Sequence, residues 1–130
     1  MTNLQNIFAS PCSEQEIIEM SPLALAFIGD GVHTMHVRDS VIKNGGVVGF
    51  HKKSAGQCNA KAQAQKLDRL ISSLKPCEQD IVRRARNAKT HNIAKNSDIE
   101  TYKKATSFEA LVGYLYLKGD YDRLNEILKY

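Results

Sequence analysis

Two acidic residues lie in apolar stretches of this chain, where a carboxylate is costly to bury. Asp30 stands between two glycines in AFIGDGV (residues 26–32), and helical spacing puts it on one face with Leu23, Ala26 and Phe27. Glu109 stands in SFEALVGYLYL (residues 107–117), where its neighbours are apolar or small. We expect both carboxylates to lie on buried helix faces, each with a glycine within one turn.

Two buried carboxylates favour a hard metal ion between them. Burying an isolated carboxylate costs several kcal/mol unless a partner offsets the cost, and two like charges in a low-dielectric site repel each other. Carboxylate oxygens without a soft ligand nearby favour Mg²⁺ or Mn²⁺ over zinc. The sequence therefore predicts that Asp30 and Glu109 hold Mg²⁺, with Mn²⁺ as the alternative. For Asp30 considered alone, a structural ion pair with a cation such as Arg38 explains the residue equally well.

The positive charge of the chain is unevenly distributed. The net charge is +4, but residues 40–67 contain five lysines and no acid, and residues 81–97 contain five more cations and no acid. Such segregation favours a polyanionic partner, with nucleic acid ahead of an anionic membrane surface, whereas a solvated basic face is the simpler alternative. A magnesium site beside basic surfaces indicates phosphodiester chemistry. The candidate RNA-binding residues are Lys52, Lys53, Arg83, Arg84, Arg86, Asn87, Lys89 and Lys95.

Composition favours a cytoplasmic protein of one domain, residues 1–130. No apolar run approaches the roughly 20 residues that span a bilayer, and the N-terminus lacks the pattern of a secretory signal. The three cysteines lack zinc or redox spacing, so we expect reduced, mostly buried thiols. The four histidines are scattered, and we expect structural roles for His33 and His36.

Helical spacing and capping motifs predict an all-α fold, because no segment alternates like a strand. A capping box begins at Ser13 and a second at Ser97, Ser21-Pro22 starts a long helix, and Gly119 ends another. Residues 89–97 are polar and without periodicity, which is typical of a loop. The predicted helices follow Ser13 and then cover residues 22 to about 43, 51–74, 77–88, 98–118 and 120–130.

Several motifs resemble a known family. LALAFIGDGV (residues 23–32) is similar to the signature helix of ribonuclease III catalytic domains, and ATSFEALVGYLYL (residues 105–117) is similar to their second acidic motif. HKKS, RARNAK and KNSDIETYKKATSFEALVGYLYL resemble the Mini-ribonuclease III subfamily more closely. The resemblance covers residues 21–117 and implies an all-helical domain that forms a homodimer. It also implies Mg²⁺-dependent cleavage of double-stranded RNA that leaves 5′-phosphate and 3′-hydroxyl ends.

The resemblance assigns roles to single residues. Asp30 falls on the catalytic aspartate of the family and Glu109 on its metal-binding glutamate. Phe27 falls where the family places an aromatic residue in the subunit interface, although a core residue would look the same in the sequence. The subfamily implies maturation of precursor 23S ribosomal RNA, with a large-subunit ribosomal protein as a further candidate partner.

The chain also departs from the family pattern. Leu23, Ala26 and Thr106 occupy positions where the resemblance implies further acids in the larger enzymes, and we expect no separate RNA-binding domain after Glu109. Asp98 either supplements the metal site or serves the start of its helix. The loss of acids leaves a non-catalytic RNA-binding or ribosome-assembly factor as the main alternative function. A helix-turn-helix DNA-binding protein also fits the charge but leaves both carboxylates unexplained.

Overall fold

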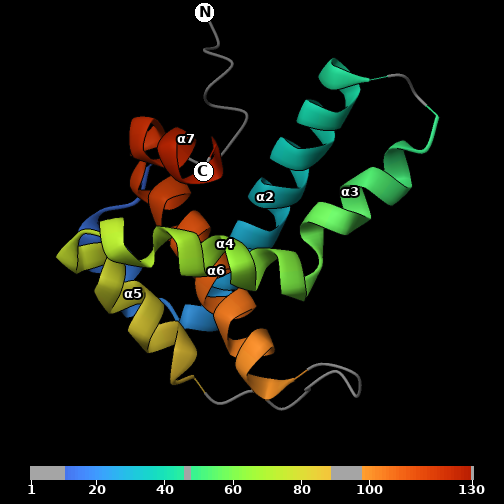
Figure 1. The fold of residues 1–130 in the computed structure, drawn as a ribbon. Coiled ribbons are helices and arrows are strands. Elements are labelled where there is room, and N and C mark those ends of the chain that lie inside the picture. Colours follow the sequence, from blue (N-terminus) through green and yellow to red (C-terminus); the bar gives the residue numbers. More distant parts are fainter. Residues whose placement is uncertain (1–10, 46–47, 89–97, 130) are drawn as a thin grey trace, which may run out of the picture.

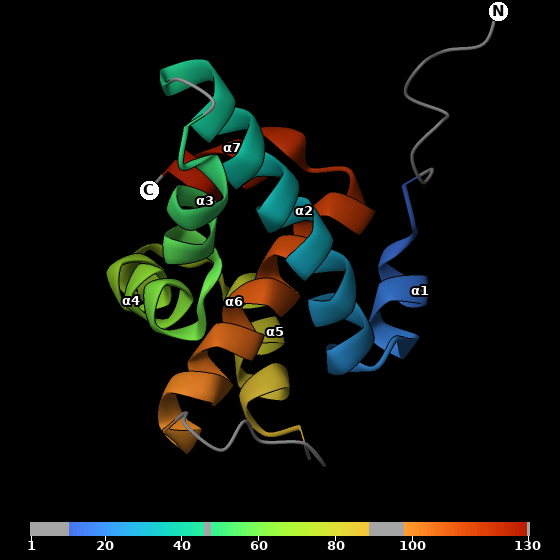
Figure 2. The ribbon, with the colours of Figure 1, turned by 90° about the vertical axis from the view of Figure 1, so that its right-hand side faces the viewer.

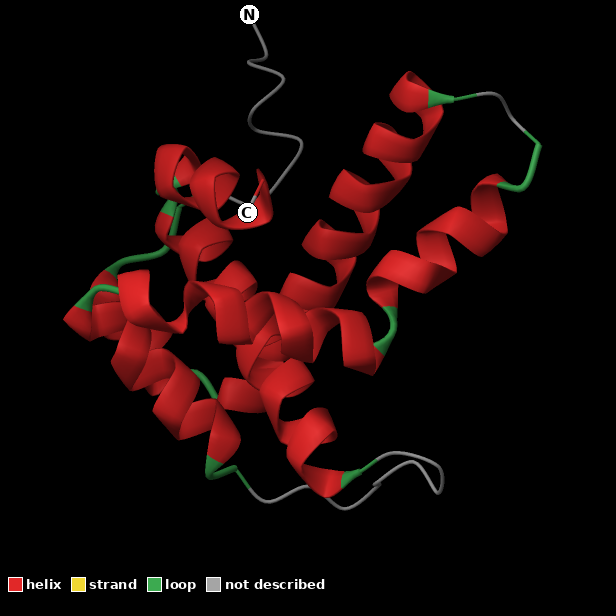
Figure 3. Ribbon diagram, viewed as in Figure 1, coloured by secondary structure: helices red, strands yellow, loops and turns green. Residues whose placement is uncertain are grey.

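The computed structural model describes residues 11–45, 48–88 and 98–129, and within these ranges every regular element is helical (Figure 3). The all-α prediction is therefore confirmed, and none of the described helices is long and apolar enough to cross a membrane. The elements are α1 (Glu14–Glu19), α2 (Pro22–Asn44), α3 (Phe50–Cys58), α4 (Ala60–Leu70), the 3₁₀ turn η2 (Ile71–Ser73), α5 (Pro76–Arg86), α6 (Ile99–Lys118) and α7 (Tyr121–Lys129).

Local capping explains where most helices begin and end. The predicted capping box of α1 is present: the Ser13 hydroxyl accepts from the Glu16 N–H at 3.2 Å, and the Glu16 carboxylate accepts from the Ser13 N–H at 3.1 Å. Gly119 ends α6 in the left-handed region with a φ of 81°, which glycine adopts without strain. Asp98 caps α6 by accepting from the Glu100 N–H at 3.2 Å, so it serves the helix start. The cap predicted at Ser97 and the loop predicted over residues 89–97 lie outside the described residues.

The predicted continuous helix over residues 51–74 was also wrong. Asn59 separates α3 from α4, because its side-chain oxygen accepts from the Ala62 N–H at 2.8 Å and begins a new helix. The chain therefore turns at Asn59, and Figure 1 shows α3 alongside α2 while α4 crosses the domain. This break allows α4 to pack against α6, which is where the candidate site lies.

Helix α6 is the centre of the fold. It packs against α1, α2, α4, α5 and α7, and Figures 1 and 2 both show it passing through the middle of the domain. Most of its residues from Ala105 to Leu117 are buried. The other helices add apolar side chains to the same core, including Ile17, Leu25, Leu67, Leu70, Ile81 and Ile127.

Two glycines let α2 and α6 cross with their backbones in contact. A Cβ atom on Gly29 would lie 1.7 Å from the Glu109 carbonyl oxygen, and one on Gly113 would lie 1.9 Å from the Leu25 carbonyl oxygen. No side chain fits at either position without separating the helices. By contrast, a Cβ on Gly31 would meet nothing within 4 Å. The helix crossing therefore requires Gly29 and Gly113, but Gly31 has no such role within the described chain.

Two sets of side-chain hydrogen bonds connect the outer helices to one another around α6. Arg123 of α7 donates from Nε and Nη2 to the two carboxylate oxygens of Glu78, both at 2.8 Å, and Glu78 is only 1% exposed. Arg84 of α5 donates to the carbonyl oxygens of Ile18 and Met20 at 3.2 and 3.3 Å, which satisfies the end of α1. The Arg123 pair supplies a buried carboxylate with partners, as a stable core requires, whereas the Arg84 contacts lie nearer the surface.

The cysteines and histidines differ in how well they match the predictions. Cys77 is exposed, and Cys12 and Cys58 are only half-buried, so the expectation of mostly buried thiols was wrong. His33 is buried and stacks edge-on against Phe108 with the ring centres 5.0 Å apart, which confirms a structural environment.

Replacing the two glycines of α2 tests the close crossing. We expect Gly29→Ala to lower the free energy of unfolding by about 3 kcal/mol or more, because the added methyl group overlaps the α6 backbone. Gly31→Ala is the matched control, and we expect it to leave stability unchanged or raise it by up to about 1 kcal/mol, as alanine does inside a helix. Chemical denaturation measures both, and equal stabilities for the two variants would contradict the close crossing.

Candidate catalytic metal site

Asp30 and Glu109 meet where α2 crosses α6. Gly29 lies against the backbone of Glu109, so the next residue, Asp30, is placed beside the Glu109 side chain. Both carboxylates line a hollow of about 270 Å³ that is open to solvent. Its other lining residues are Leu23, Ala26, Phe27, Tyr102 and Thr106. The structure thus brings together the two acids that the sequence singled out, which are separated by 79 positions in the chain.

The environment of Glu109 opposes its negative charge. Burial, together with the adjacent Asp30 carboxyl, raises the pKa of Glu109 to about 8. Gln63 acts in the opposite direction, because its hydrogen bonding to Glu109 lowers the pKa. Among the ion pairs of the described residues, none includes Asp30, Glu109 or Arg38, so the structural ion pair considered for Asp30 is absent there.

A second buried glutamate shows what a structural carboxylate looks like in this fold. Glu78 is also buried, but two nitrogens of Arg123 and the Lys75 N–H bind its oxygens. Although burial alone would raise the pKa of Glu78, these partners hold it below the usual range. Glu109 has a second acid where Glu78 has a cation. The Asp30–Glu109 pair therefore lacks the positive charge that would stabilise its ionised form.

The donor set fits a hard divalent cation with several other ligands. Two carboxylates provide anionic oxygens, which Mg²⁺ and Mn²⁺ prefer. In the described part of the chain, no cluster of three or more histidine, cysteine, aspartate or glutamate side chains is arranged to hold a metal. Leu23, Ala26 and Thr106, the positions at which the family resemblance implies further acids, line the same hollow. Water and substrate oxygens would have to complete the coordination.

The face of α2 that carries Asp30 is largely exposed, contrary to our expectation, and of its predicted residues only Ala26 is buried. Helix α6 covers the stripe that runs through Leu25, Gly29 and His33, while Phe27 is 80% exposed and Leu23 is 38% exposed. Asp30 itself is exposed at the edge of this uncovered face. Glu109 is partly buried, as expected, among buried residues of α6. Helical spacing correctly placed Leu23, Phe27 and Asp30 on one face of α2, but it did not predict that the rest of the chain leaves this face largely uncovered.

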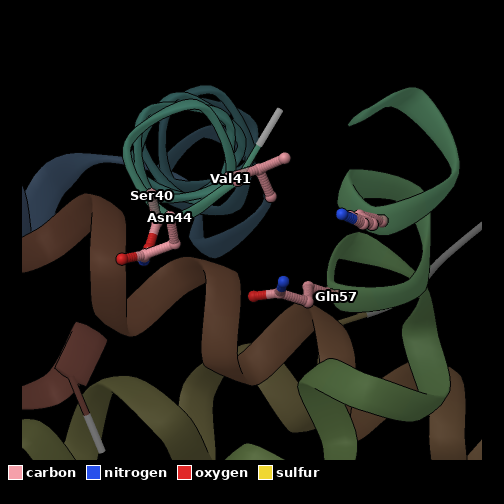
Figure 4. A pocket seen from close by; sticks show the side chains of 6 residues that line it. Ser40, Val41, Asn44 and Gln57 are labelled. Atoms are coloured by element: carbon pink, nitrogen blue, oxygen red, sulfur yellow. The ribbon is translucent and has the colours of Figure 1, made fainter. Parts of the chain in front are cut away.

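The basic candidates of residues 40–67 lie on α3. Lys52 and Lys53 are exposed in its first turn. Lys53 also lines a separate hollow of about 180 Å³ between α2 and α3, where Ser40, Val41 and Asn44 of α2 lie opposite Gln57 of α3 (Figure 4). This hollow contains neither catalytic candidate. The two lysines remain available for contacts with a polyanion.

The basic candidates of residues 81–97 have several different environments. Arg83 and Arg86 are exposed near the end of α5, where they form ion pairs with Asp80 and Glu100. Arg84 is only partly exposed, and its guanidinium group is already bound to carbonyl oxygens at the end of α1. Asn87 caps the end of α5. Lys89 and Lys95 lie outside the described residues.

Sequence reasoning missed two residues near the acids. Tyr102 lines the catalytic hollow from α6, and Gln63 reaches Glu109 from α4. Tyr102 carries no distinguishing pattern in the sequence. Gln63 does carry one, because it precedes Leu67 by four positions and Leu70 by seven, on the apolar face of its helix. A glutamine at that position is a buried amide that needs partners.

Comparisons with known proteins agree on one family. The Ribonuclease III domain matches residues 23–120. A protein named Mini-ribonuclease 3 from Thermoanaerobacter sp. is 42% identical to this chain over 90% of this chain and 84% of its own length. A second protein of that name, from Brevibacillus brevis, is 45% identical over 84% of this chain and 83% of its own length. A crystal structure of a Fusobacterium nucleatum protein superposes with a TM-score of 0.79 at 29% identity, covering 88% of this chain and 93% of that one. With the site at the α2–α6 crossing, these matches show that the chain belongs to the ribonuclease III family, alongside the Mini-ribonuclease 3 proteins.

Proposed function

We propose that this chain is a Mg²⁺-dependent endoribonuclease that cleaves double-stranded RNA at the Asp30–Glu109 pair, with Mn²⁺ as the alternative metal. The observation that carries this proposal is the partly buried Glu109, whose close neighbour is a second acid and not a cation, at the edge of an open hollow. Membership of the ribonuclease III family supports the nuclease activity. A binding-only factor would leave this electrostatic arrangement without a purpose.

The two acids have distinct positions in the proposed reaction. When bound, the metal would activate a water molecule and stabilise the charge that develops on the scissile phosphate. Glu109 offers an oxygen from the interior, and Asp30 offers one from the exposed edge of the hollow. The open side leaves room for a phosphate of the RNA backbone. Hydrolysis there would give 5′-phosphate and 3′-hydroxyl ends.

We propose that a second copy of the chain covers the face around Phe27. An aromatic side chain that is 80% exposed beside the exposed Leu23 is unfavourable in water, and a symmetric partner would bury both. A homodimer would carry two sites, one for each strand of a duplex. The proposed substrate is precursor 23S ribosomal RNA, as the subfamily resemblance implies, in the cytoplasm. A large-subunit ribosomal protein remains a candidate partner.

Neutralising either acid tests the catalytic assignment. We expect Asp30→Asn and Glu109→Gln each to lower the rate of duplex cleavage in Mg²⁺ by about 10²–10³-fold or more, because electrostatic stabilisation of a transition state is commonly worth that much. Binding of the duplex, measured by filter retention without metal, should survive. Asp122→Asn, an exposed acid on α7, is the control and should cleave normally. Normal cleavage by both site variants would exclude this site. If the wild-type protein binds the duplex but does not cleave it in any divalent metal, the result would favour a non-catalytic assembly factor.

The stability of the metal-free protein should depend on pH through Glu109. Its pKa is about 8 in the folded chain and 4.5 when unperturbed, so the folded state holds the proton more tightly. Raising the pH between these values should therefore lower the free energy of unfolding, by at most about 1.4 kcal/mol per pH unit. Denaturant titrations from pH 5 to about 8.5 should show this loss for the wild type relative to Glu109→Gln. Parallel pH profiles would show that Glu109 titrates normally.

The lysines of α3 should contribute to RNA binding through phosphate contacts. We expect the double variant Lys52→Ala/Lys53→Ala to reduce the slope of log affinity against log salt by about 1–2, because each lost phosphate contact removes close to one unit. Lys129→Ala, an exposed lysine on α7, is the control. Fluorescence anisotropy with a labelled duplex measures the slope, and an unchanged slope in the double variant would place the RNA elsewhere.

A further inference from the structure

Two further hollows lie between α2, α3, α4 and α7, and neither shares a lining residue with the catalytic hollow. The larger, of about 440 Å³, is lined from all four helices, and the smaller, of about 210 Å³, from α2, α3 and α4. Gln57 and Lys66 line both hollows, so the two adjoin, and we call them together the basic groove. Its exposed and partly exposed polar side chains are His36, Ser40, Gln57, Lys66, Arg69 and Lys129.

The ionisable side chains that line the basic groove are all basic. No described aspartate or glutamate lines either hollow. Among the ion pairs within residues 11–45, 48–88 and 98–129, none includes His36, Lys66, Arg69 or Lys129. Asp39 acts on His36 electrostatically, but its carboxylate is paired with Lys43 at 2.8 Å. The groove therefore gathers positive charge that the described chain does not neutralise.

Lys66 is the central cation of the groove, because it lines both hollows and is only partly exposed. Its ammonium group donates to the Leu128 carbonyl at the end of α7 and lies 6.0 Å from the ring centre of Phe108, so the fold fixes its position. An ammonium group has three donors, and the Leu128 carbonyl takes one of them. Capping α7 thus explains one contact of Lys66 but leaves two donors for a ligand in the groove.

The basic groups of the groove oppose one another's charges. Burial lowers the pKa of Lys66, and the charge of Arg69 lowers it further. Burial also lowers the pKa of His36, and the charges of Lys66 and Lys129 add to this effect. These cations therefore lie close enough to repel one another, which is costly in a partly buried site. An anion between them would replace the repulsion with attraction.

A phosphate monoester suits this groove better than a phosphodiester of an RNA backbone. A monoester carries between one and two negative charges at neutral pH and offers three acceptor oxygens, whereas a backbone diester carries one charge. Lys66 and His36 are only partly exposed, unlike the fully exposed Lys52 and Lys53, which are better placed to reach the outside of a duplex. The larger hollow also falls within the range of small-ligand sites, roughly 300–1,000 Å³.

We propose that the basic groove is a binding site for a phosphate monoester, held by Lys66 and Arg69 of α4 together with Gln57 of α3 and His36 of α2. The group has two sources with the same chemistry, a small free phosphorylated molecule and the 5′-phosphate end of an RNA. Neither acid of the catalytic pair takes part, so this inference does not rest on the proposed cleavage reaction.

Titration of the metal-free wild-type protein with inorganic phosphate, at an ionic strength held constant with chloride, tests the site. We expect saturable shifts of the amide NMR signals of Gln57, Lys66 and Arg69. Lys66→Met removes the ammonium group and should weaken phosphate binding about 10-fold or more, as expected for lost hydrogen bonds to a charged group. Lys61→Met, at an exposed position of α4 outside the groove, is the matched control and should bind like the wild type. Shifts that do not saturate, or equal losses in both variants, would overturn the proposal.

A second variant covers the case in which Lys66→Met does not fold without its hydrogen bond to α7. Arg69 is exposed and takes part in none of the described ion pairs, so Arg69→Gln should fold like the wild type. We expect Arg69→Gln to bind phosphate several-fold more weakly. Wild-type phosphate affinity in this variant, with its fold checked by circular dichroism, would exclude the groove as the site.

Further ligands identify the chemical class and the source. Dimethyl phosphate, which carries the single charge of a backbone diester, should bind about 10-fold or more weakly than inorganic phosphate, and equal affinity would contradict a monoester site. Metal-free binding of duplexes with 5′-phosphate or 5′-hydroxyl ends then separates the sources. Tighter binding of the 5′-phosphate duplex that disappears in Lys66→Met would assign the groove to RNA ends, whereas equal binding would assign it to a free phosphorylated molecule. Because none of these measurements involves cleavage, the groove and the catalytic site can fail independently.

Discussion

The contact between the backbones of α2 and α6 is the constraint on which the rest of this structure depends. Gly29 rests against the carbonyl group of Glu109, and Gly113 rests against that of Leu25, so the helices approach more closely than any side chain would allow. The crossing point is also the candidate site, because Asp30 follows Gly29 directly and Glu109 is itself part of the contact. Any change that separates the helices would therefore separate the two acids.

Glu78 and Glu109 show how the same fold surrounds a structural acid and a candidate catalytic acid differently. Glu78 receives a bidentate ion pair from Arg123, which joins α5 to α7. Glu109 receives a neighbouring acid and an amide, and its proton affinity rises. A buried charge without a compensating cation costs stability, so its presence indicates a requirement outside the isolated chain. The divalent metal that we propose at the pair would satisfy that requirement, and the hollow beside the pair is open to solvent.

The basic surface is less uniform than its sequence windows suggested. Arg84 binds the end of α1, and Arg83 and Arg86 form ion pairs with Asp80 and Glu100, which lie just outside the acid-free segment 81–97. Lys52 and Lys53 on α3 remain exposed. Membership of the ribonuclease III family excludes the helix-turn-helix DNA-binding alternative. A surface of separated cations suits recognition of a duplex backbone by shape, with no reading of base edges.

The sequence by itself determined the all-helical class, most helix ends and the pair of acids, because these features depend on short-range rules. Ser13, Pro22 and Gly119 mark helix ends through capping and backbone preferences, and each acid stands out as a carboxylate among apolar neighbours. Only the tertiary structure decided that Asn59 breaks a helix-forming stretch, that Phe27 and Asp30 lie on an uncovered face, and that the Gln63 amide contacts His33 in the core. The reason is that periodicity defines the face of a helix but not its neighbour. Which residues cover that face depends on contacts between segments far apart in the chain, and here the Gly29–Gly113 crossing determines those contacts.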